Sequence, residues 1–271
     1  MQLGQIAFIG GGVMGEAILK SLLASGTATA SQIAVGDPVA QRQKDLAERY
    51  GIRVSGDNAG VARGADIVVL AVKPQMMGQA LGQFRAACAP TALVISIAAG
   101  TPIATIREML HAEQPVVRVM PNTPAQIGMG MSAWTATPNV SVAQLDQTRT
   151  ILAAMGDEVQ VPDEHYIDMA TAINGSGPGY VFLILEAMID AAVRLGFARP
   201  VAEKLVLQTV RGSAEYAIQS KQHPALLRNQ VTSAGGTTAA GLFELDKGGL
   251  RTTLDNAIFA AYHRAVELGQ S

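Results

Sequence analysis

The sequence predicts an α/β fold, in which a doubly wound, mostly parallel sheet precedes an all-helical domain. Over the first 162 residues, short apolar runs alternate with amphipathic helical patterns, which is typical of a parallel sheet flanked by helices. Beyond about residue 163 the strand-like runs stop and helical patterns follow one another. We therefore expect two domains, residues 1–162 and 163–271, with the boundary close to Pro162.

The first predicted strand leads into a glycine-rich turn. The apolar run QIAFI at 5–9 enters GGGVMG, and a helical pattern follows and closes at Gly26. The turn matches G-x-G-x-x-G, the Rossmann dinucleotide-binding fingerprint, whose glycines allow a tight turn and the close approach of a pyrophosphate. The helix start supplies unpaired backbone N–H groups to the phosphates. The cofactor contacts expected here are Gly10, Gly12, Val13, Met14 and Gly15.

The alternation continues through the rest of the first domain. Strand-like runs follow at 33–37, 66–72, 92–98, 116–120 and 157–161. Helical patterns lie between them at 40–50, 75–87 and 101–112. This order makes a Rossmann-like dinucleotide domain a better hypothesis than a doubly wound domain that binds no nucleotide.

Asp37 ends the second predicted strand, where an acid in this fold typically contacts the adenosine ribose. A carboxylate there accepts hydrogen bonds from a ribose 2′-hydroxyl and repels a 2′-phosphate, which favours NADH. Arg42 and Lys44 follow closely and can accommodate a phosphate if Asp37 points away. The sequence therefore leaves both NADH and NADPH open as the cofactor.

The segment AVKPQ follows directly on the strand-like run at 66–72. Because the carboxyl ends of strands in such a sheet lie beside the bound cofactor, we expect Ala71, Val72, Lys73 and Pro74 to line it. Taken alone, Lys73 is equally consistent with a surface lysine at the end of a strand.

Composition and charge favour a globular protein that acts on a small metabolite. The 271 residues are 49% hydrophobic and 15% charged, and the formal net charge is −2. This charge gives no basic field for a nucleic acid partner. The start of the chain does not resemble a secretion signal, and proline and glycine interrupt the uncharged stretch at 86–106, so we expect no membrane span. The single cysteine, Cys88, cannot form an internal disulfide, which favours a cytoplasmic location.

The second domain begins with a long and unusually apolar helical pattern, YVFLILEAMIDAAVRLG, at 180–196. Its charges Glu186, Asp190 and Arg194 recur every four residues and define one narrow polar stripe. The remaining apolar surface must be buried by other helices or by another subunit, which favours a homo-oligomer. Helical patterns follow at 202–220, 223–230, 238–248 and 251–268.

Two helix starts in this domain are rich in glycine and hydroxyl groups, NGSGPGY at 174–180 and VTSAGGTT at 231–238. Each can be a simple helix cap. Two in one small domain beside a nucleotide fold provide more anion-binding N–H groups than packing requires, so a small anionic substrate is expected.

Several motifs together resemble the pyrroline-5-carboxylate reductase family. They are GGGVMG, AVKPQ, RVMPNTP at 118–124, NGSGPGY and VTSAGGTT, in that order along nearly the whole chain. The resemblance implies hydride transfer from NADPH or NADH to the C=N carbon of 1-pyrroline-5-carboxylate, which yields L-proline. It also implies that the helical domain is a dimerisation domain that pairs with a second copy, and that dimers can assemble further into rings.

The resemblance also assigns roles to individual residues. The VTSAGGTT segment matches the loop that holds the substrate carboxylate in the family, and Thr238 is its candidate catalytic residue. Glu164 matches a family acid near the substrate, while Asn58, Ala98 and Gln230 border the nucleotide. The substrate-binding residues implied in the loop are Val231, Ser233, Gly236, Thr237 and Thr238.

Two positions depart from the usual family pattern. Gln230 stands where asparagine is common, and its longer amide must be placed differently. Ala234 stands where proline is common, which removes a stiffening of the loop. Neither change removes a group on which the chemistry depends.

Two rival hypotheses explain part of the pattern. A beta-hydroxyacid dehydrogenase would carry a catalytic lysine on the long helix after NGSGPGY, and this helix contains none. A non-catalytic nucleotide-binding scaffold would have no use for the hydroxyl-rich loop at 231–238. No group of His, Cys or acidic residues has the spacing of metal ligands, and the four histidines lie outside the motifs.

Overall fold

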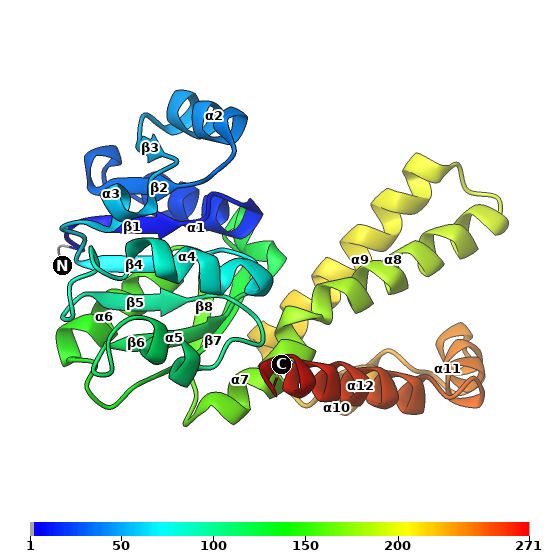
Figure 1. The fold of residues 1–271 in the computed structure, drawn as a ribbon. Helices are drawn as coiled ribbons and strands as arrows, with labels where there is room; N and C mark the ends of the chain where they lie inside the picture. Colours follow the sequence, from blue (N-terminus) through cyan, green and yellow to red (C-terminus); the bar gives the residue numbers. More distant parts are fainter. Residues whose placement is uncertain (1–2, 271) are drawn as a thin grey trace. The chain divides into compact units, whose positions relative to one another are not determined.

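The computed structural model describes residues 3–270 and contains an eight-stranded sheet in the order β3-β2-β1-β4-β5-β6-β7-β8 (Figure 1). The strands β1 to β6 are parallel to one another, β7 is antiparallel to β6, and β8 is parallel to β7. The predicted mostly parallel, Rossmann-like sheet is confirmed. The strands are β1 (Ile6–Ile9), β2 (Ile33–Gly36), β3 (Arg53–Ser55), β4 (Ile67–Leu70), β5 (Leu93–Ser96), β6 (Val116–Met120), β7 (Gly130–Ala136) and β8 (Gly156–Gln160).

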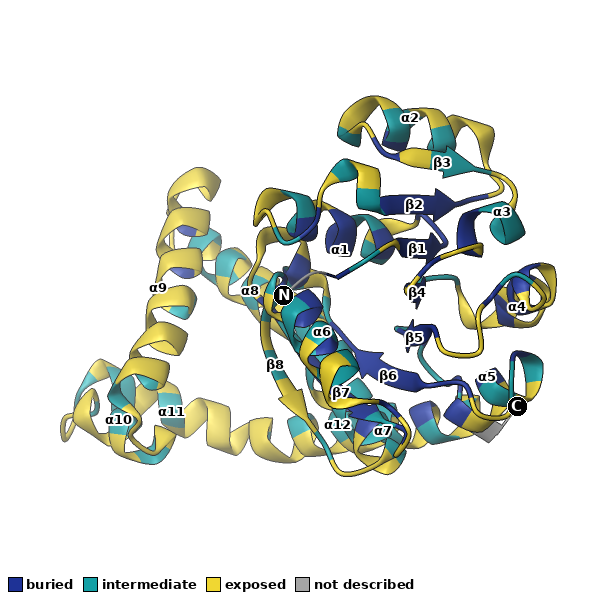
Figure 2. Cartoon of the chain, turned by 90° about the vertical axis from the view of Figure 1, so that its left-hand side faces the viewer, coloured by how far each residue is buried: buried dark blue, intermediate teal, exposed yellow. Residues whose placement is uncertain are grey.

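Both faces of the central strands are buried. Ile6 and Phe8 of β1 belong to one hydrophobic cluster, whereas Ala7 and Ile9 belong to a second cluster on the opposite face. Figure 2 shows these central strands as buried along their length. A strand that is covered on both faces needs apolar residues at every position, and this explains why its sequence reads as a continuous apolar run.

Helices connect the strands and cover the sheet. The helices of this part are α1 (Val13–Ala24), α2 (Ala40–Tyr50), α3 (Asn58–Ala62), α4 (Met77–Phe84), α5 (Ile103–Met109) and α6 (Val142–Ala153). Short 3-10 turns are η1 (Ala30–Gln32), η2 (Pro74–Met76) and η3 (Thr123–Ile127).

The strands β3 and β7 were not expected from the sequence. β3 has only three residues, of which Arg53 is exposed, so it forms no apolar run. β7 reads GMSAWTA, which contains small and hydroxyl-bearing residues. It is nevertheless buried, because Trp134 is fully enclosed in the core and Thr135 is 4% exposed.

The remaining helices follow β8. They are α7 (Glu164–Ala170), α8 (Gly177–Arg194), α9 (Arg199–Ser220), α10 (Pro224–Gln230), α11 (Thr237–Lys247) and α12 (Leu250–Gln270). A π-helical turn, η4 (Thr171–Gly175), joins α7 to α8. All helical patterns expected beyond residue 163 form helices, and α7 is an addition to them.

The chain divides into two compact units. One, the sheet unit, comprises residues 1–178 and 261–271, and the other, the helical unit, comprises residues 179–260. The sheet unit therefore extends past Pro162, where the sequence placed the domain boundary. The physical reason is that α7 and η4 attach to the sheet: Ile167 is buried with Met120, and the Asn174 amide donates to the Met120 carbonyl at 2.9 Å.

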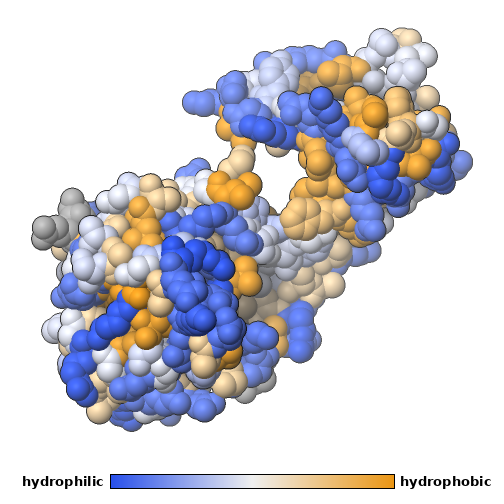
Figure 3. Space-filling model, turned by 90° about the horizontal axis from the view of Figure 1, so that it is seen from above, coloured by the Kyte–Doolittle hydropathy of each residue, from blue (hydrophilic) through white to orange (hydrophobic). Residues whose placement is uncertain are grey.

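The helical unit has little buried surface of its own. Among its residues, all of which the structure describes, only Ala202 and Val206 are buried. On α8, Phe182 is 60% exposed and Leu183 is 66% exposed. Figure 2 shows these helices as mostly exposed, and the space-filling view in Figure 3 shows hydrophobic residues on their surface. The apolar helix predicted from the sequence is thus uncovered in a single chain.

The helical stretch Glu164–Arg194 also has the length and composition of a membrane-crossing segment. Its mean hydropathy is 1.3, and none of its apolar window is buried. Among the described residues it is the one stretch with this property. A helix that packs against another part of a protein can have the same length and composition. The expectation of no membrane span therefore stays a prediction.

The reactivity of Cys88 provides a test of whether this residue is buried in the core. It is 4% exposed, and burial raises the pKa of its thiol to about 11. Because very little thiolate then exists near neutral pH, we expect the folded chain to resist alkylation by iodoacetamide. Mass spectrometry of the treated protein measures this. The same treatment in denaturant is the control, and equally fast labelling of folded and unfolded chains would contradict the prediction.

Candidate active site

A cleft of about 320 Å³ lies in the sheet unit, beside the segments that follow the carboxyl ends of β1, β2, β3 and β4. Nucleotides bind at this edge of doubly wound sheets. It is lined by Gly10, Gly12, Asp37, Pro38, Val39, Gly56, Asn58, Ala71, Val72, Lys73, Met76, Gln79, Ala80 and Gln83.

The turn between β1 and α1 is closely packed at Gly10 and Gly15 and open at Gly12. Gly10 has a φ of +103°, and a Cβ there would lie 2.7 Å from the Ala71 carbonyl oxygen. A Cβ on Gly15 would lie 2.6 Å from the Gly10 oxygen. Around the Cβ position of Gly12, by contrast, no atom beyond Gly12 and its two chain neighbours lies within 4 Å. Gly12 caps α1 without a side-chain hydrogen bond, so uncapped N–H groups meet open space, which fits a dinucleotide pyrophosphate.

Asp37 lies at the end of β2 and is 9% exposed. Its Oδ2 accepts from the Gly11 N–H and its Oδ1 from the Val39 N–H, each at 2.9 Å. An ionised carboxylate has more acceptor sites than these two bonds occupy. Asp37 therefore stabilises the glycine turn and can still accept hydrogen bonds from ribose hydroxyls in the cleft.

Arg42 and Lys44, the other candidates for recognition of the ribose, do not line the cleft. The Arg42 Nε donates to the Gly11 carbonyl at 2.6 Å, and its Nη2 contacts Glu16 Oε2 at 2.5 Å. Lys44 pairs with Glu48 at 3.8 Å on an exposed face of α2.

Glu16 is the centre of a charged cluster behind the glycine turn. It also accepts hydrogen bonds from Arg49 and from the Tyr50 hydroxyl. Burial acts to raise the pKa of Glu16, but the hydrogen bonds from Arg42 and Tyr50 outweigh this effect and hold the pKa below its usual value. Glu16 therefore remains a carboxylate at neutral pH.

The other expected cofactor residues of the sheet unit do not line the cleft. Val13 is 66% exposed at the start of α1, while Met14 packs partly against the core and Gly15 is buried. Pro74 begins η2, and Ala98 is 4% exposed shortly after β5. Their roles in binding stay predictions.

Some cleft residues were missed by the sequence analysis. The nearest signal was available for Gly56, because it directly follows β3 and the carboxyl ends of parallel strands share one edge. The sequence contained no signal that Gln83 lines the cleft, because Gln83 reaches the cleft only through the packing of α4. There its Oε1 accepts from the Asn58 amide at 2.6 Å.

Glu164 and Asp168 are partly exposed partners of the buried Arg118. Arg118 of β6, whose side chain is 3% exposed, contacts Glu164 at 3.0 Å and Asp168 at 2.7 Å. The same Glu164 oxygen accepts from the Ile103 N–H at 2.9 Å. A buried guanidinium requires such partners, since removal of one leaves an uncompensated charge. The network joins α7 to the sheet, and it was not expected from the sequence.

The expected substrate loop lies in the helical unit, before α11. Gly236 caps α11 without a side-chain hydrogen bond, and its own N–H donates to the Ser233 carbonyl at 3.1 Å. Thr237 is exposed and Thr238 is partly exposed. Val231 is 66% exposed. The loop thus presents hydroxyl groups and the free helix start at the surface of the chain.

Gln230 also belongs to the helical unit. Its amide donates to the Gln222 side chain at 2.9 Å. Gln230 therefore directly precedes the substrate loop along the chain. Its expected contact with the cofactor stays a prediction.

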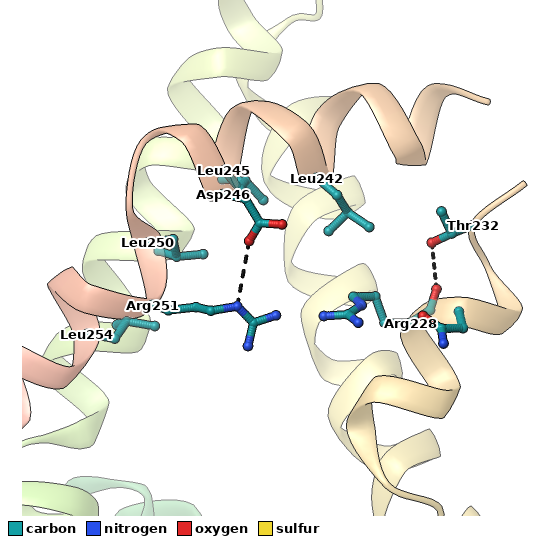
Figure 4. Close-up of a pocket in the computed structure, with 9 residues that line it drawn as sticks. Arg228, Thr232, Leu242, Leu245, Asp246, Leu250, Arg251 and Leu254 are labelled. Carbon is teal, nitrogen blue, oxygen red and sulfur yellow. Dashed lines mark hydrogen bonds and ion pairs between the residues drawn. The ribbon is translucent and has the colours of Figure 1, made fainter. Parts of the chain in front are cut away.

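A hollow of about 640 Å³ opens within the helical unit between α10, α11 and α12 (Figure 4). Arg228 lies on its α10 side, and Arg251 pairs with Asp246 at 3.6 Å. Its apolar lining consists of Leu242, Leu245, Leu250 and Leu254. Within residues 3–270, no group of three or more His, Cys, Asp or Glu residues has an arrangement that could hold a metal ion.

The fold and the glycine-lined cleft define a class of protein, the dinucleotide-dependent oxidoreductases with a Rossmann-like domain. Residues 5–100 match the family model described as "NADP oxidoreductase coenzyme F420-dependent", and residues 164–268 match "Pyrroline-5-carboxylate reductase dimerisation". A pyrroline-5-carboxylate reductase of Synechocystis is 43% identical over 266 residues, which cover 98% of each chain. This chain belongs to the pyrroline-5-carboxylate reductase family.

Solved structures agree with this assignment. A pyrroline-5-carboxylate reductase from Coxiella burnetii is 36% identical with a TM-score of 0.92, and 99% of this chain and 100% of that chain are covered. A Plasmodium falciparum pyrroline carboxylate reductase, solved with NADP bound, is 32% identical with a TM-score of 0.91, and 99% of each chain is covered. The resemblance inferred from the motifs is confirmed, and the beta-hydroxyacid dehydrogenase hypothesis is set aside.

The glycine turn provides a matched pair of substitutions. We expect Gly12→Ala to fold with a change in stability within about 0.5 kcal/mol, because its φ of −66° suits alanine and the space is open. The new methyl group occupies the phosphate space, so the affinity for NADH or NADPH falls at least about tenfold. Nucleotide titration and thermal unfolding measure the two effects.

Two further variants control this experiment. Gly15→Ala places its Cβ against the Gly10 carbonyl and is expected to destabilise the fold by about 1–3 kcal/mol. Gly82→Ala adds a methyl group in open space outside the cleft and is expected to leave the nucleotide affinity unchanged. Because Gly82 lies within α4, this variant is expected to raise the stability by about 0.5–1 kcal/mol. Normal nucleotide affinity in Gly12→Ala would show that the turn does not hold the phosphates.

Proposed function

We propose that this chain reduces 1-pyrroline-5-carboxylate to L-proline, with NADH or NADPH as the hydride donor. The observation that carries the proposal is the glycine-lined cleft at the carboxyl edge of the sheet, in a chain that matches pyrroline-5-carboxylate reductases along nearly its whole length. The cleft accounts for the cofactor, and the family accounts for the substrate.

The roles of the sheet-unit residues follow from the geometry of the turn. Gly10 and Gly15 hold the backbone in place, and the N–H groups beyond Gly12 bind the pyrophosphate. Asp37 accepts the ribose hydroxyls, while Asn58 and Lys73 line the same cleft. The cofactor, when bound, supplies the hydride that adds to the ring carbon.

The substrate loop binds the other reactant in this proposal. Backbone N–H groups at the start of α11 and the hydroxyl of Thr238 hold the substrate carboxylate, with Val231 and Ser233 beside them. Neutral donors bind this anion without adding a positive charge that would repel a protonated imine. Most of the rate enhancement then arises from positioning of the hydride donor and the acceptor carbon.

In this proposal Glu164 has two roles, one in the fold and one at the substrate. Its ion pair with Arg118 stabilises the attachment of α7 to the sheet. Its side chain is still 34% exposed, so a free carboxylate edge can also contact the substrate. Gln230 contributes its amide to the nucleotide in place of the asparagine that is usual in the family.

We further propose that two copies of the chain form a homodimer through the helical unit. The exposed apolar side chains of α8, such as Phe182 and Leu183, need a cover. A two-fold dimer supplies it with the same surface of a second chain. The match of residues 164–268 to a dimerisation family supports this occupant over a membrane. Rings of dimers and a cytoplasmic location belong to the same proposal.

The first test combines activity with a loop variant. The purified chain is expected to oxidise NADH or NADPH, followed by absorbance, only when 1-pyrroline-5-carboxylate is present. In Thr238→Ala the KM for pyrroline carboxylate is expected to rise about tenfold through loss of one hydrogen bond to a charged group, while nucleotide affinity is unchanged.

Thr150→Ala serves as the matched control, because this threonine bonds only to its own helix at Asp146 in α6. It is expected to behave as the unmodified chain. No oxidation with either cofactor would refute the reductase activity, and loss of nucleotide binding in Thr238→Ala would show that the loop is misassigned.

The dimer is tested by analytical ultracentrifugation. The chain is expected to sediment with at least twice its single-chain mass of 28.2 kDa. Leu183→Glu, at a 66% exposed site of α8, is expected to shift it toward monomer. Val142→Glu, at a 75% exposed site of the sheet unit, is the control and leaves the dimer intact. A monomeric unmodified chain at micromolar concentration would refute this interface.

A further inference from the structure

An acidic residue lines the cleft at the end of β2. Asp37 directly follows that strand and places an acidic side chain in the lining of the cleft. It lies where the ribose 2′-position is expected in this fold. A 2′-hydroxyl can donate to it, whereas a 2′-phosphate meets a like charge and needs a nearby cation to offset the repulsion.

Arg42 is the basic residue that follows Asp37 most closely along the chain, and it does not line the cleft. It lies near the start of α2, a few residues after Asp37. Its guanidinium bonds to the Gly11 carbonyl and to Glu16, and the two side chains are only 24% and 17% exposed. Glu16 is fixed in turn by Arg49 and Tyr50.

Two other basic residues near the cleft follow different elements. Lys44 pairs with Glu48 on the exposed face of α2. Lys73 lines the cleft but follows β4, which is separated from β2 by β1. Neighbouring strands lie about 4.8 Å apart, so the backbone positions at the ends of β2 and β4 are about 10 Å apart.

We infer that Glu16 determines nucleotide specificity in this chain: by holding Arg42 on the Gly11 carbonyl, it leaves Asp37 as the charge that faces the 2′-position, and the chain selects NADH over NADPH. The inference rests on the proposed use of a dinucleotide cofactor and makes that proposal more specific. Glu16 itself is a positioning residue, since it acts through Arg42. Its position on the first turn of α1 links nucleotide choice to the helix that holds the pyrophosphate.

The experiment measures the dissociation constants of NADH and NADPH by nicotinamide fluorescence, without substrate. The unmodified chain is expected to bind NADH at least about tenfold more tightly than NADPH. In Glu16→Gln the carboxylate that holds Arg42 is lost, and the dissociation constant for NADPH is expected to fall about tenfold through one charge-assisted contact with phosphate. The constant for NADH is expected to change less than about twofold, since Glu16 does not line the cleft.

Two variants make the result specific. Arg49→Gln removes another partner of Glu16 but keeps the Glu16–Arg42 pair, so it is expected to leave the preference unchanged. The double variant Glu16→Gln with Arg42→Gln is expected to lose the gain for NADPH. Equal changes in Glu16→Gln and Arg49→Gln, or tighter binding of NADPH than NADH by the unmodified chain, would overturn the inference.

Binding is measured apart from catalysis, so the two proposals can fail separately. A chain that selects NADH in this way but does not reduce pyrroline carboxylate supports the role of Glu16 and refutes the reductase activity. A chain that reduces pyrroline carboxylate with either nucleotide equally well, and whose preference does not respond to Glu16→Gln, refutes the role of Glu16 alone. A chain that binds neither nucleotide refutes the role of Glu16 as well.

Discussion

The close approach of α1 to the end of β1 is the constraint on which the candidate site depends. Gly15 lies so near the Gly10 carbonyl that no side chain fits between them. This contact brings the uncapped start of α1 to the carboxyl edge of the sheet, beside Gly12 and the open space around it. The donors for the phosphates are therefore backbone groups whose direction is set by packing, and they require no mobile lysine or arginine.

Two arginines of the sheet unit, one buried and one partly buried, join one element to another. Arg118 is paired with two acids that join α7 to the sheet. Arg42 is paired with Glu16 behind the glycine turn. In both places a guanidinium fixes one element against another, because an unpaired buried charge would be costly. Arg42 is therefore absent from the lining of the cleft, where Asp37 and Lys73 are the charged residues.

The helical unit buries few of its own residues within a single chain. Its long helices expose apolar residues such as Phe182 and Leu183, and only Ala202 and Val206 are buried among its residues, all of which the structure describes. A domain of this kind gains its core when a second chain covers it. The expected substrate loop lies in the same unit, so a site completed by association is consistent with the fold and with the dimerisation family that matches this region.

The sequence by itself determined the alternation of strands and helices, the glycine turn and the family, because continuous apolar runs and fixed glycine spacings reflect local requirements of the backbone. It did not reveal β7, whose small and polar residues are buried only through tertiary packing around Trp134. It also did not reveal the ion pairs of Arg42 and Glu164. The tertiary structure decided these, because the direction of a long charged side chain depends on partners such as Glu16 and Arg118, which lie far away along the chain.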